Sequence, residues 1–337
     1  MAQAALAPGP GSAPSPWGAA PTLARHAATR SGGSPSAMLA KELLCLVGVL
    51  QPAVPRAGYL AEVWHKVNAD IQERELRGHF VGYENSSGYP VPTYLSRPAF
   101  DGKTRRPAVI VVHHAVGIYN HEFLRKFTDD LAEEGFIAVL PDFFHRVWDD
   151  KTVPNGIGIP VEQMNIMGAL GSLKDKEILD DLRTVIAKLE KDTYVRSESI
   201  GILGFCMGGR IAWLAAVAPE LQGKIKAAVP YHGGNVFKGL GDGAVAPAER
   251  IKTSLQCPVL GHFGAVDKNP SPADMARLKE LAGDKLKTKV YPGADHGFAC
   301  RDSAKYVEDA ATEAWTETLS FLKDTLGEPE VEQTVEL

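Results

Sequence analysis

A cysteine set in a glycine-rich turn is the most chemically informative feature of the sequence. Residues 204–209 read Gly-Phe-Cys-Met-Gly-Gly, between a short apolar run, 199–203, and a helix-like run, 210–217. This strand, turn and helix context is that of a nucleophile elbow, in which a sharp turn holds the central side chain above a sheet. Glycines on both sides leave room for such a turn to close. We therefore interpret Cys206 as a nucleophile, with a buried structural cysteine as the alternative.

A thiol needs activation to attack a carbonyl at neutral pH, because an unperturbed thiol has a pKa of about 8.5 and is mostly protonated. A helix that begins directly after Cys206 would favour the thiolate through its dipole and its unpaired N–H groups. A neighbouring histidine would favour it too. The backbone N–H of Met207, at the start of that helix, is the expected donor to the oxyanion of a tetrahedral intermediate.

The partners of a nucleophile elbow follow it in the order acid and then histidine. A strand-like run, 257–264, leads into a loop that carries Asp267, which we predict to orient the histidine. A second run, 287–291, leads into a turn that delivers His296 to the same edge of the sheet. We predict His296 to be the general base, or the imidazolium partner of a thiolate. Asp295 is the rival acid, but a carboxylate next to the histidine in sequence rarely reaches its ring with the right geometry.

These segments together resemble the dienelactone hydrolases (carboxymethylenebutenolidases) of the α/β-hydrolase superfamily. The likeness covers roughly residues 78 to 326 and includes the segments 89–98, 107–117 and 131–144, in the family's order. The resemblance implies hydrolysis of an enol-lactone or a similar small ester by a Cys-His-Asp triad. It implies a thioester acyl-enzyme and no cofactor.

The resemblance also implies which groups surround the substrate. The backbone N–H of Ala115 matches the family's second oxyanion donor by its position after a strand. His114 stands where the best-known members carry a glutamate that holds the resting thiol, and a neutral imidazole cannot act as that carboxylate does. Arg301 is a candidate for binding a substrate carboxylate, with a solvated surface arginine as the alternative. Phe298 is expected to line the pocket. His113 and His114 are neighbours without a third ligand at metal-site spacing, so no metal is expected.

Alternation of strand-like and helix-like runs predicts an α/β-hydrolase fold, with a mostly parallel central sheet and helices on both faces. In such a fold the ligand site lies at the carboxyl ends of the strands. Cys206, Asp267 and His296 each follow a strand-like run, so all three are expected at that edge. The strand-like runs are 108–113, 137–140, 200–203, 227–231, 259–263 and 287–291, and the helix-like runs include 124–134, 173–191, 273–282 and 304–326.

Composition limits the function classes. A chain of 337 residues with 45% hydrophobic and 23% charged residues fits one large globular domain. The net charge of −5 argues against a nucleic-acid partner, and no apolar run reaches the roughly 20 residues that span a membrane. Four cysteines without disulfide-scaffold spacing favour a reducing compartment, and the cytoplasm is the expected location.

The first residues differ in kind from the rest. We predict a disordered or targeting extension over 1–57, the hydrolase domain over 58–328, and a flexible acidic tail over 329–337. No acidic residue precedes Glu42, and the start is rich in Ala, Pro, Gly and Ser. Because acid-poor, arginine- and serine-containing starts resemble organelle transit peptides, a mitochondrion or plastid is the alternative location. A mistaken start codon or a plain disordered tail fits equally well.

The expected partner is a small ester or lactone, and the sequence leaves monomer and dimer equally open. Three rival functions remain. One is a general carboxylesterase or thioesterase on the same scaffold. Another is a non-catalytic binding protein of the hydrolase fold, suggested by His114. The third is a redox sensor that uses Cys206 and Cys300.

Overall fold

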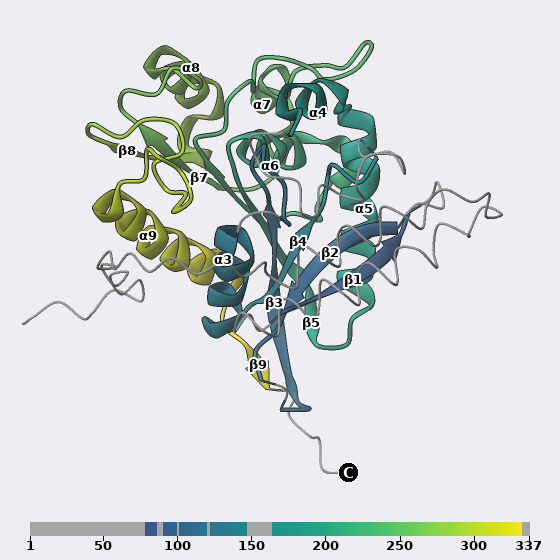
Figure 1. The fold of residues 1–337 in the computed structure, drawn as a ribbon. Coiled ribbons are helices and arrows are strands. Elements are labelled where there is room, and N and C mark those ends of the chain that lie inside the picture. The colour runs from purple at the N-terminus through teal and green to yellow at the C-terminus, as the bar shows by residue number, and fades with distance from the viewer. Residues whose placement is uncertain (1–77, 86–89, 100, 120–121, 147–163, 332–337) are drawn as a thin grey trace, which may run out of the picture. The chain divides into compact units, whose positions relative to one another are not determined.

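A mixed β-sheet forms the core of the part of the chain that the computed structural model describes, residues 78–85, 90–99, 101–119, 122–146 and 164–331 (Figure 1). All of these residues lie in one unit, Ala57–Leu337. The strands are β1 (His79–Glu84), β2 (Pro90–Ser96), β3 (Thr104–Val112), β4 (Ile137–Pro141), β5 (Val195–Phe205), β6 (Ala227–Tyr231), β7 (Val259–Gly264), β8 (Leu286–Tyr291) and β9 (Glu330–Val331).

The strand order is β1-β2-β4-β3-β5-β6-β7-β8, and β9 pairs with β3 off this path. Strands β4, β3, β5, β6, β7 and β8 run parallel to one another. The hairpin β1–β2 and the pairs β2–β4 and β3–β9 are antiparallel. Because the parallel strands share one direction, the loops that follow β3, β5, β6, β7 and β8 leave the sheet at the same edge.

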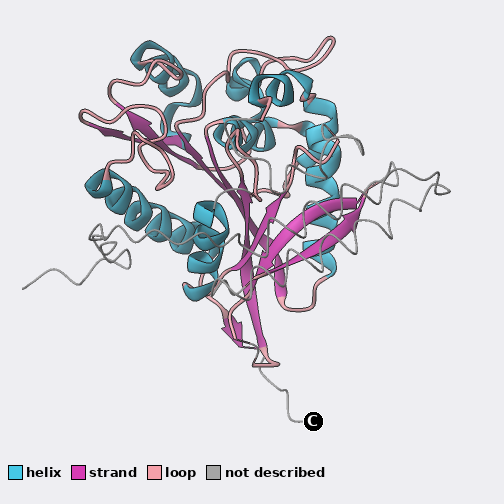
Figure 2. Cartoon of the chain, viewed as in Figure 1, coloured by secondary structure: helices cyan, strands magenta, loops and turns pink. Residues whose placement is uncertain are grey.

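Helices cover both faces of the sheet (Figures 1 and 2). Helices α3 and α9 lie together on one face, where the rings of Phe127 and Trp315 pack at 4.8 Å, and α5 and α6 lie on the other. The helices are α3 (Glu122–Glu133), α4 (Ile166–Ser172), α5 (Asp175–Lys191), α6 (Met207–Val217), α7 (Pro247–Ser254), α8 (Pro272–Ala282) and α9 (Glu308–Leu326), with short 3₁₀ turns at Pro219–Leu221 and Gly283–Lys285.

Helix α6 differs from its neighbours because it is buried on every side. All eleven of its residues are buried, whereas α3 and α5 bury one face each and expose charged residues on the other. A helix that is mostly apolar all round belongs in the interior of a protein. Helix α6 contacts β3, β5 and β6 as well as α5 and α7, so it is the most enclosed element on its face.

The start of α6 approaches the sheet so closely that only glycine fits there. A Cβ atom at Gly208 would lie 2.2 Å from the carbonyl oxygen of Val112, the last residue of β3. A Cβ atom at Gly204 would lie 2.3 Å from the carbonyl oxygen of Gly208. Any larger residue would force the helix away from the strands. These contacts fix residue 206, which stands between the two glycines, at the carboxyl edge of the sheet.

The predicted fold class is confirmed, and all six predicted strands are present. Strand β6 has the predicted bounds, 227–231, whereas β5 begins at Val195 instead of residue 200. The additional residues of β5, 195–199, are mostly polar. They extend the strand because Val195 pairs with Arg106 of β3. The four predicted helices form as well, with α9 beginning at Glu308 rather than residue 304.

Several short elements were not predicted. Strand β1 has only weak alternation, α7 spans eight residues, and β9 is two residues long. Strand β9 lies within the predicted tail, 329–337, where Glu330 and Val331 pair with Arg105 and Thr104. The predicted extension, 1–57, and the helix-like run 59–77 lie outside the described residues.

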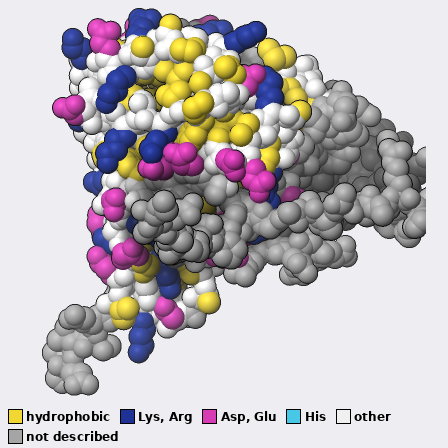
Figure 3. All heavy atoms as spheres, turned by 90° about the vertical axis from the view of Figure 1, so that its left-hand side faces the viewer, with side chains coloured by type: hydrophobic (Ala, Val, Ile, Leu, Met, Phe, Trp, Pro, Cys, Tyr) yellow, Lys and Arg dark blue, Asp and Glu magenta, His cyan; other side chains and the backbone are white. Residues whose placement is uncertain are grey.

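The surface mixes both signs of charge. On the face shown in Figure 3, apolar side chains gather in the upper part, with Lys, Arg, Asp and Glu around them. Val266, Val290 and Val307, which lie after β7, in β8 and before α9, are exposed apolar residues. Within the described ranges, no helix combines the length and the apolarity needed to cross a membrane.

Replacing Gly208 by alanine is expected to destabilise the fold by about 2 kcal/mol or more, because overpacking against a rigid backbone atom costs this order of free energy. Gly171→Ala, in α4, is the matched control, since a Cβ atom there meets nothing within 4 Å. The control should keep or slightly raise the unfolding free energy, by at most about 1 kcal/mol. Urea unfolding of both variants measures the difference, and equal stabilities would refute the close-contact argument.

Candidate active site

Cys206 occupies the turn between β5 and α6 in a backbone conformation that L-residues seldom adopt. Its φ is 56° and its ψ is −113°. The N–H of Cys206 donates to the carbonyl oxygen of Tyr231 at 3.0 Å and to Nδ1 of His232 at 3.1 Å. The strained turn is therefore held by hydrogen bonds to the end of β6 and by the glycine contacts on either side.

The side chains of Asp267 and His296 meet at the carboxyl ends of β7 and β8. Oδ2 of Asp267 lies 3.0 Å from Nδ1 of His296, and Oδ1 accepts the N–H of Asn269 at 2.8 Å. Both oxygens of this buried carboxylate are thus held in place. The Cys206 side chain lies near enough to the His296 ring to contribute to raising its pKa. The fold therefore brings Asp267, His296 and Cys206 together at the carboxyl edge of the sheet.

The rival acid, Asp295, has different partners. Its Oδ1 accepts the backbone N–H of His296 at 2.7 Å, and its Oδ2 pairs with Nζ of Lys305 at 2.7 Å. The hydrogen bond from Lys305 lowers the pKa of Asp295, which lies at the surface. Of the two acids weighed from the sequence, the structure brings Asp267 to the imidazole ring.

The surroundings of His296 favour its protonated form. Burial by itself would lower the pKa of His296, but the hydrogen bonds to Asp267 and Cys206 outweigh burial and raise it to about 10. The imidazole then carries a proton at neutral pH. An imidazolium beside a cysteine sulfur is the arrangement that stabilises a thiolate.

The two expected oxyanion donors belong to neighbouring segments. Met207 is the first residue of α6, where backbone N–H groups have no partner within the helix. Ala115 lies in the turn that follows β3. Because Gly208 abuts Val112, the start of α6 and the end of β3 are in contact. Both N–H groups therefore lie at the edge of the sheet that carries Cys206.

His114 lies in a cluster with Cys300 and Asp302 that the sequence did not predict. One potential ligand atom from each residue lies within 4.8 Å of the others, and Nε2 of His114 is 3.4 Å from Oδ2 of Asp302. Nδ1 of His114 accepts the N–H of Val116 at 3.2 Å, so the proton of a neutral ring resides on Nε2, toward Asp302. A metal at this cluster would need the lone pair of that same Nε2. The hydrogen bonding therefore favours a His–Asp contact over metal ligation.

The two other residues predicted to contact the substrate, Arg301 and Phe298, differ in their exposure to solvent. Arg301 is an exposed residue, and the preceding residue, Cys300, is buried with its Sγ 3.8 Å from Nε2 of His232. A thiol thus faces the site one residue before the predicted guanidinium. Phe298 is fully buried, and its ring packs against Tyr291 at 5.0 Å and His232 at 5.8 Å. It supports the loop that carries His296.

His232 is a residue of the site that sequence reasoning missed. It directly follows β6, which lies between the strand of the nucleophile, β5, and the strand of the acid, β7. Its ring contacts the ring of His296, with the centroids 4.7 Å apart. The available signal was positional: a histidine after a central parallel strand, next in sheet order to the elbow strand, must lie at the same edge.

A buried ion pair anchors α6 behind the site. Arg210, one helical turn after Cys206, donates to both carboxylate oxygens of Asp175 at 2.6 and 3.0 Å. The same guanidinium donates to the carbonyl oxygens of Asn235 and Lys238. Helix α6, the start of α5 and the segment after β6 are thereby tied together, which limits movement of the turn at Cys206.

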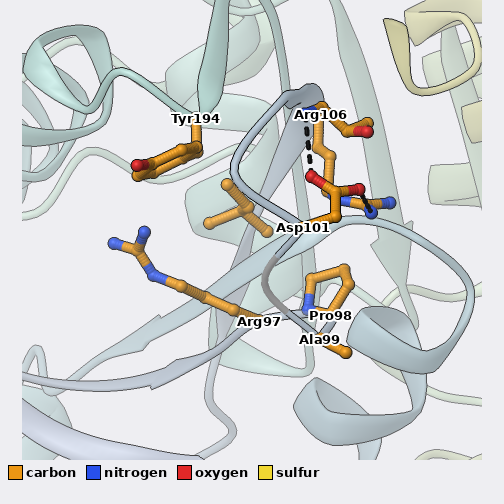
Figure 4. A pocket seen from close by; sticks show the side chains of 8 residues that line it. Arg97, Pro98, Ala99, Asp101, Arg106 and Tyr194 are labelled. Atoms are coloured by element: carbon orange, nitrogen blue, oxygen red, sulfur yellow. Dashed lines mark hydrogen bonds and ion pairs between the residues drawn. The ribbon is translucent and has the colours of Figure 1, made fainter. Parts of the chain in front are cut away.

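A small cavity lies at the opposite edge of the sheet from Cys206 (Figure 4). It measures about 50 Å³, room for water-sized molecules only. Asp101 borders it and accepts hydrogen bonds from the N–H of Thr104 and the guanidinium of Arg106, at the amino end of β3. The cavity contains none of the predicted site residues, which all lie at carboxyl ends of strands.

A strained cysteine after one parallel strand, with an aspartate and a histidine after two later strands, defines an α/β-hydrolase. Solved structures share this fold. One is esterase 2 of Thermogutta terrifontis, with 17% sequence identity and a TM-score of 0.56 over 72% of this chain and 94% of that chain. At this identity the likeness concerns the fold alone.

The chain belongs to the dienelactone hydrolase family, whose sequence profile matches residues 91–326. A Salmonella typhimurium protein assigned as a carboxymethylenebutenolidase is 34% identical, over 70% of this chain and 83% of its own length. A Bradyrhizobium protein assigned as a 2-oxo-3-(5-oxofuran-2-ylidene)propanoate lactonase is 31% identical, over 68% and 88%. The crystal structure of a protein assigned as a dienelactone hydrolase from Klebsiella pneumoniae has 28% identity and a TM-score of 0.62, over 73% and 97%. The predicted family and enzyme class, a carboxylic ester hydrolase, are confirmed.

Asp267→Asn is expected to slow iodoacetamide labelling of Cys206 at pH 7 by about tenfold or more, because His296 loses the carboxylate that stabilises its imidazolium form. Asp295→Asn is the matched control, with a neighbouring carboxylate and the same change in charge. Since Asp295 forms a surface ion pair, its variant should label within about a factor of two of wild type. The reverse order of effects would assign the orienting role to Asp295.

Acid is expected to weaken the fold through His262, which lies one strand from His232 and bonds to Tyr291 and Thr318. Burial lowers the pKa of His262 to about 3. A histidine with a lowered folded pKa keeps its full stabilising contribution above the unfolded pKa of about 6.5 and loses it as the pH falls below that value.

The stability difference between wild type and His262→Gln should therefore shrink by about 2 kcal/mol from pH 7.5 to pH 5, as measured by urea unfolding. A difference that stays constant over this range would show that His262 takes up its proton equally well in both states.

Proposed function

We propose that the protein hydrolyses a small ester or enol-lactone through a triad of Cys206, His296 and Asp267. The observation that carries the proposal is the contact of the Asp267 carboxylate with the His296 ring at 3.0 Å, beside the strained turn of Cys206. The three groups come from the ends of three parallel strands. The elbow conformation of Cys206 supports the nucleophilic role.

In the first half of the proposed reaction, the sulfur of Cys206 attacks the carbonyl carbon as a thiolate, with His296 as imidazolium. The oxyanion of the tetrahedral intermediate accepts hydrogen bonds from the backbone N–H groups of Met207 and Ala115. Collapse of the intermediate breaks the carbon–oxygen ester bond. The leaving oxygen takes the proton from His296, and a thioester on Cys206 remains.

In the second half, His296 is a neutral base held in position by Asp267. It takes a proton from water, and the hydroxide adds to the thioester carbonyl at the same oxyanion position. Expulsion of the Cys206 thiolate gives the carboxylic acid, and the proton on His296 restores the resting ion pair. No redox or metal-dependent step is needed for this sequence to balance.

An enol-lactone is the substrate class that we favour. The Bradyrhizobium relative is named for a lactone with an exocyclic double bond, and the Salmonella relative for a butenolide. An enolate is a weak base, so it departs readily from the tetrahedral intermediate that forms when the Cys206 sulfur adds to the carbonyl carbon. In the tetrahedral intermediate formed from an amide, the Cys206 thiolate is a better leaving group than the amine. The intermediate would therefore return to the amide, so amides are poor substrates in this scheme.

A general carboxylesterase acting on uncharged esters is the second candidate. It is favoured by the side chains beside the nucleophile, where Cys300 is a buried thiol and His114 contacts Asp302. Burial raises the pKa of Cys300 well above its ordinary value, so the thiol is neutral. A neutral thiol offers no positive charge to a carboxylate on the substrate. Comparing an enol-lactone that bears a carboxylate with its methyl ester separates the two candidates.

Cys206→Ala and His296→Ala are each expected to lower kcat on p-nitrophenyl acetate and on a protoanemonin-type enol-lactone by about a thousandfold or more. Cys257→Ala is the matched control, because Cys257 is a buried cysteine that precedes β7 and should leave kcat within about twofold of wild type. A Cys206→Ala variant that keeps wild-type turnover would eliminate the proposed triad.

A further inference from the structure

His232 occupies a demanding position directly beside the proposed nucleophile. It follows the last residue of β6, its side chain is fully buried, and its φ of 36° lies in the left-handed region. Its N–H donates to the carbonyl oxygen of His262 at 2.8 Å, which continues the pairing of β6 with β7. A non-glycine residue in a left-handed backbone conformation costs free energy. We therefore expect the side chain of His232 to make contacts that offset this cost.

The first such contact is to the backbone of the nucleophile. Nδ1 of His232 accepts the N–H of Cys206 at 3.1 Å. An acceptor at Nδ1 places the ring proton on Nε2, which faces the Sγ of Cys300 at 3.8 Å. The ring can hold the Cys206 N–H only while it is neutral, because a protonated imidazole has no lone pair to offer.

The second contact is to the proposed base. The rings of His232 and His296 are 4.7 Å apart at an interplanar angle of 63°, an edge-to-face arrangement. The groups that face His232 are His296, His114, His262 and Cys300. Burial, followed by the nearby His296, lowers the pKa of His232 well below its ordinary value. His232 therefore stays neutral next to an imidazolium.

We propose that His232 is a positioning residue that fixes both halves of the Cys206–His296 pair, through Nδ1 to the Cys206 N–H and through the edge-to-face contact of its ring with the His296 ring. The proposal rests on the proposed triad, since it assigns His232 to that same site. His232 contacts Cys206 and His296, but it takes no part in making or breaking bonds to the substrate. It acts by holding the sulfur and the imidazole in reacting geometry, where small displacements carry large rate losses.

Three substitutions separate the two contacts. His232→Asn keeps an acceptor close to the Nδ1 position and tolerates positive φ, but it removes the ring. His232→Phe keeps a ring and removes the acceptor. His232→Ala removes both. We expect kcat on p-nitrophenyl acetate to fall about tenfold in each of the first two and about a hundredfold in the third, with KM unchanged, because the contacts involve different groups.

Labelling of Cys206 by iodoacetamide between pH 6 and pH 9 provides a readout that needs no substrate. A paired sulfur reacts almost equally well across this range, whereas an unpaired thiol reacts faster as the pH rises. All three variants should show a steeper rise than wild type. His262→Phe is the matched control, because it also removes a buried neutral histidine, but one that lies within β7 and is bonded to Tyr291 and Thr318. It should lower thermal stability without changing the labelling profile.

Kinetics and labelling of the three variants within twofold of wild type would overturn the proposal. A loss of kcat that follows thermal stability equally in His262→Phe and the His232 variants, with unchanged labelling profiles, would overturn it as well. Failure of the triad itself is recognised separately, by activity that persists in Cys206→Ala.

Discussion

The close approach of α6 to the sheet is the constraint on which the rest of the site depends. Gly204 and Gly208 have no Cβ atoms, so the first turn of α6 lies directly against the carbonyl groups at the end of β3. The chain changes direction within one residue between β5 and α6. Cys206 occupies this turn in a strained backbone conformation, with a φ of 56°. Its side chain is therefore held at the edge of the sheet, where a helix N-terminus favours negative charge.

The electrostatic character of the site follows from what surrounds this turn. His296 gains its raised pKa from Asp267 and Cys206, while the buried rings of His232 and His262 are kept neutral. One histidine that holds its proton thus stands among others that do not. This separation supports the proposal that a single imidazole has the acid–base role. The contact of His114 with Asp302 makes a second, distinct His–Asp pair.

Much of this could be predicted from the sequence because it was encoded locally. The elbow around Cys206 has its glycines at fixed offsets, and the loops carrying Asp267 and His296 follow apolar runs of strand length. The fold class followed from the alternation of such runs. The pairing register of the strands did not follow from this alternation. The elements β1, α7 and β9 were missed because two to eight residues with weak periodicity give little local signal.

The inner wall of the site was harder to predict, because it depends on contacts between distant segments. Cys300 faces His232 while Arg301 is exposed, a one-residue difference that only the turn geometry after His296 decides. His232 has no motif of its own, and its proposed role arises from its place at the end of β6, between the strands that precede Cys206 and Asp267. The cluster of His114 and Asp302 joins residues almost two hundred positions apart, which no spacing rule connects.

The most direct test of the central claim is mass spectrometry of the protein quenched in acid during turnover of an activated ester. The account predicts a covalent adduct with the mass of the acyl group, located on the peptide that contains Cys206. Once formed, the adduct should decay more slowly when His296 is replaced by alanine, because water is then poorly activated for the second step. An acyl group on any other residue, or turnover without any adduct in both proteins, would contradict the account.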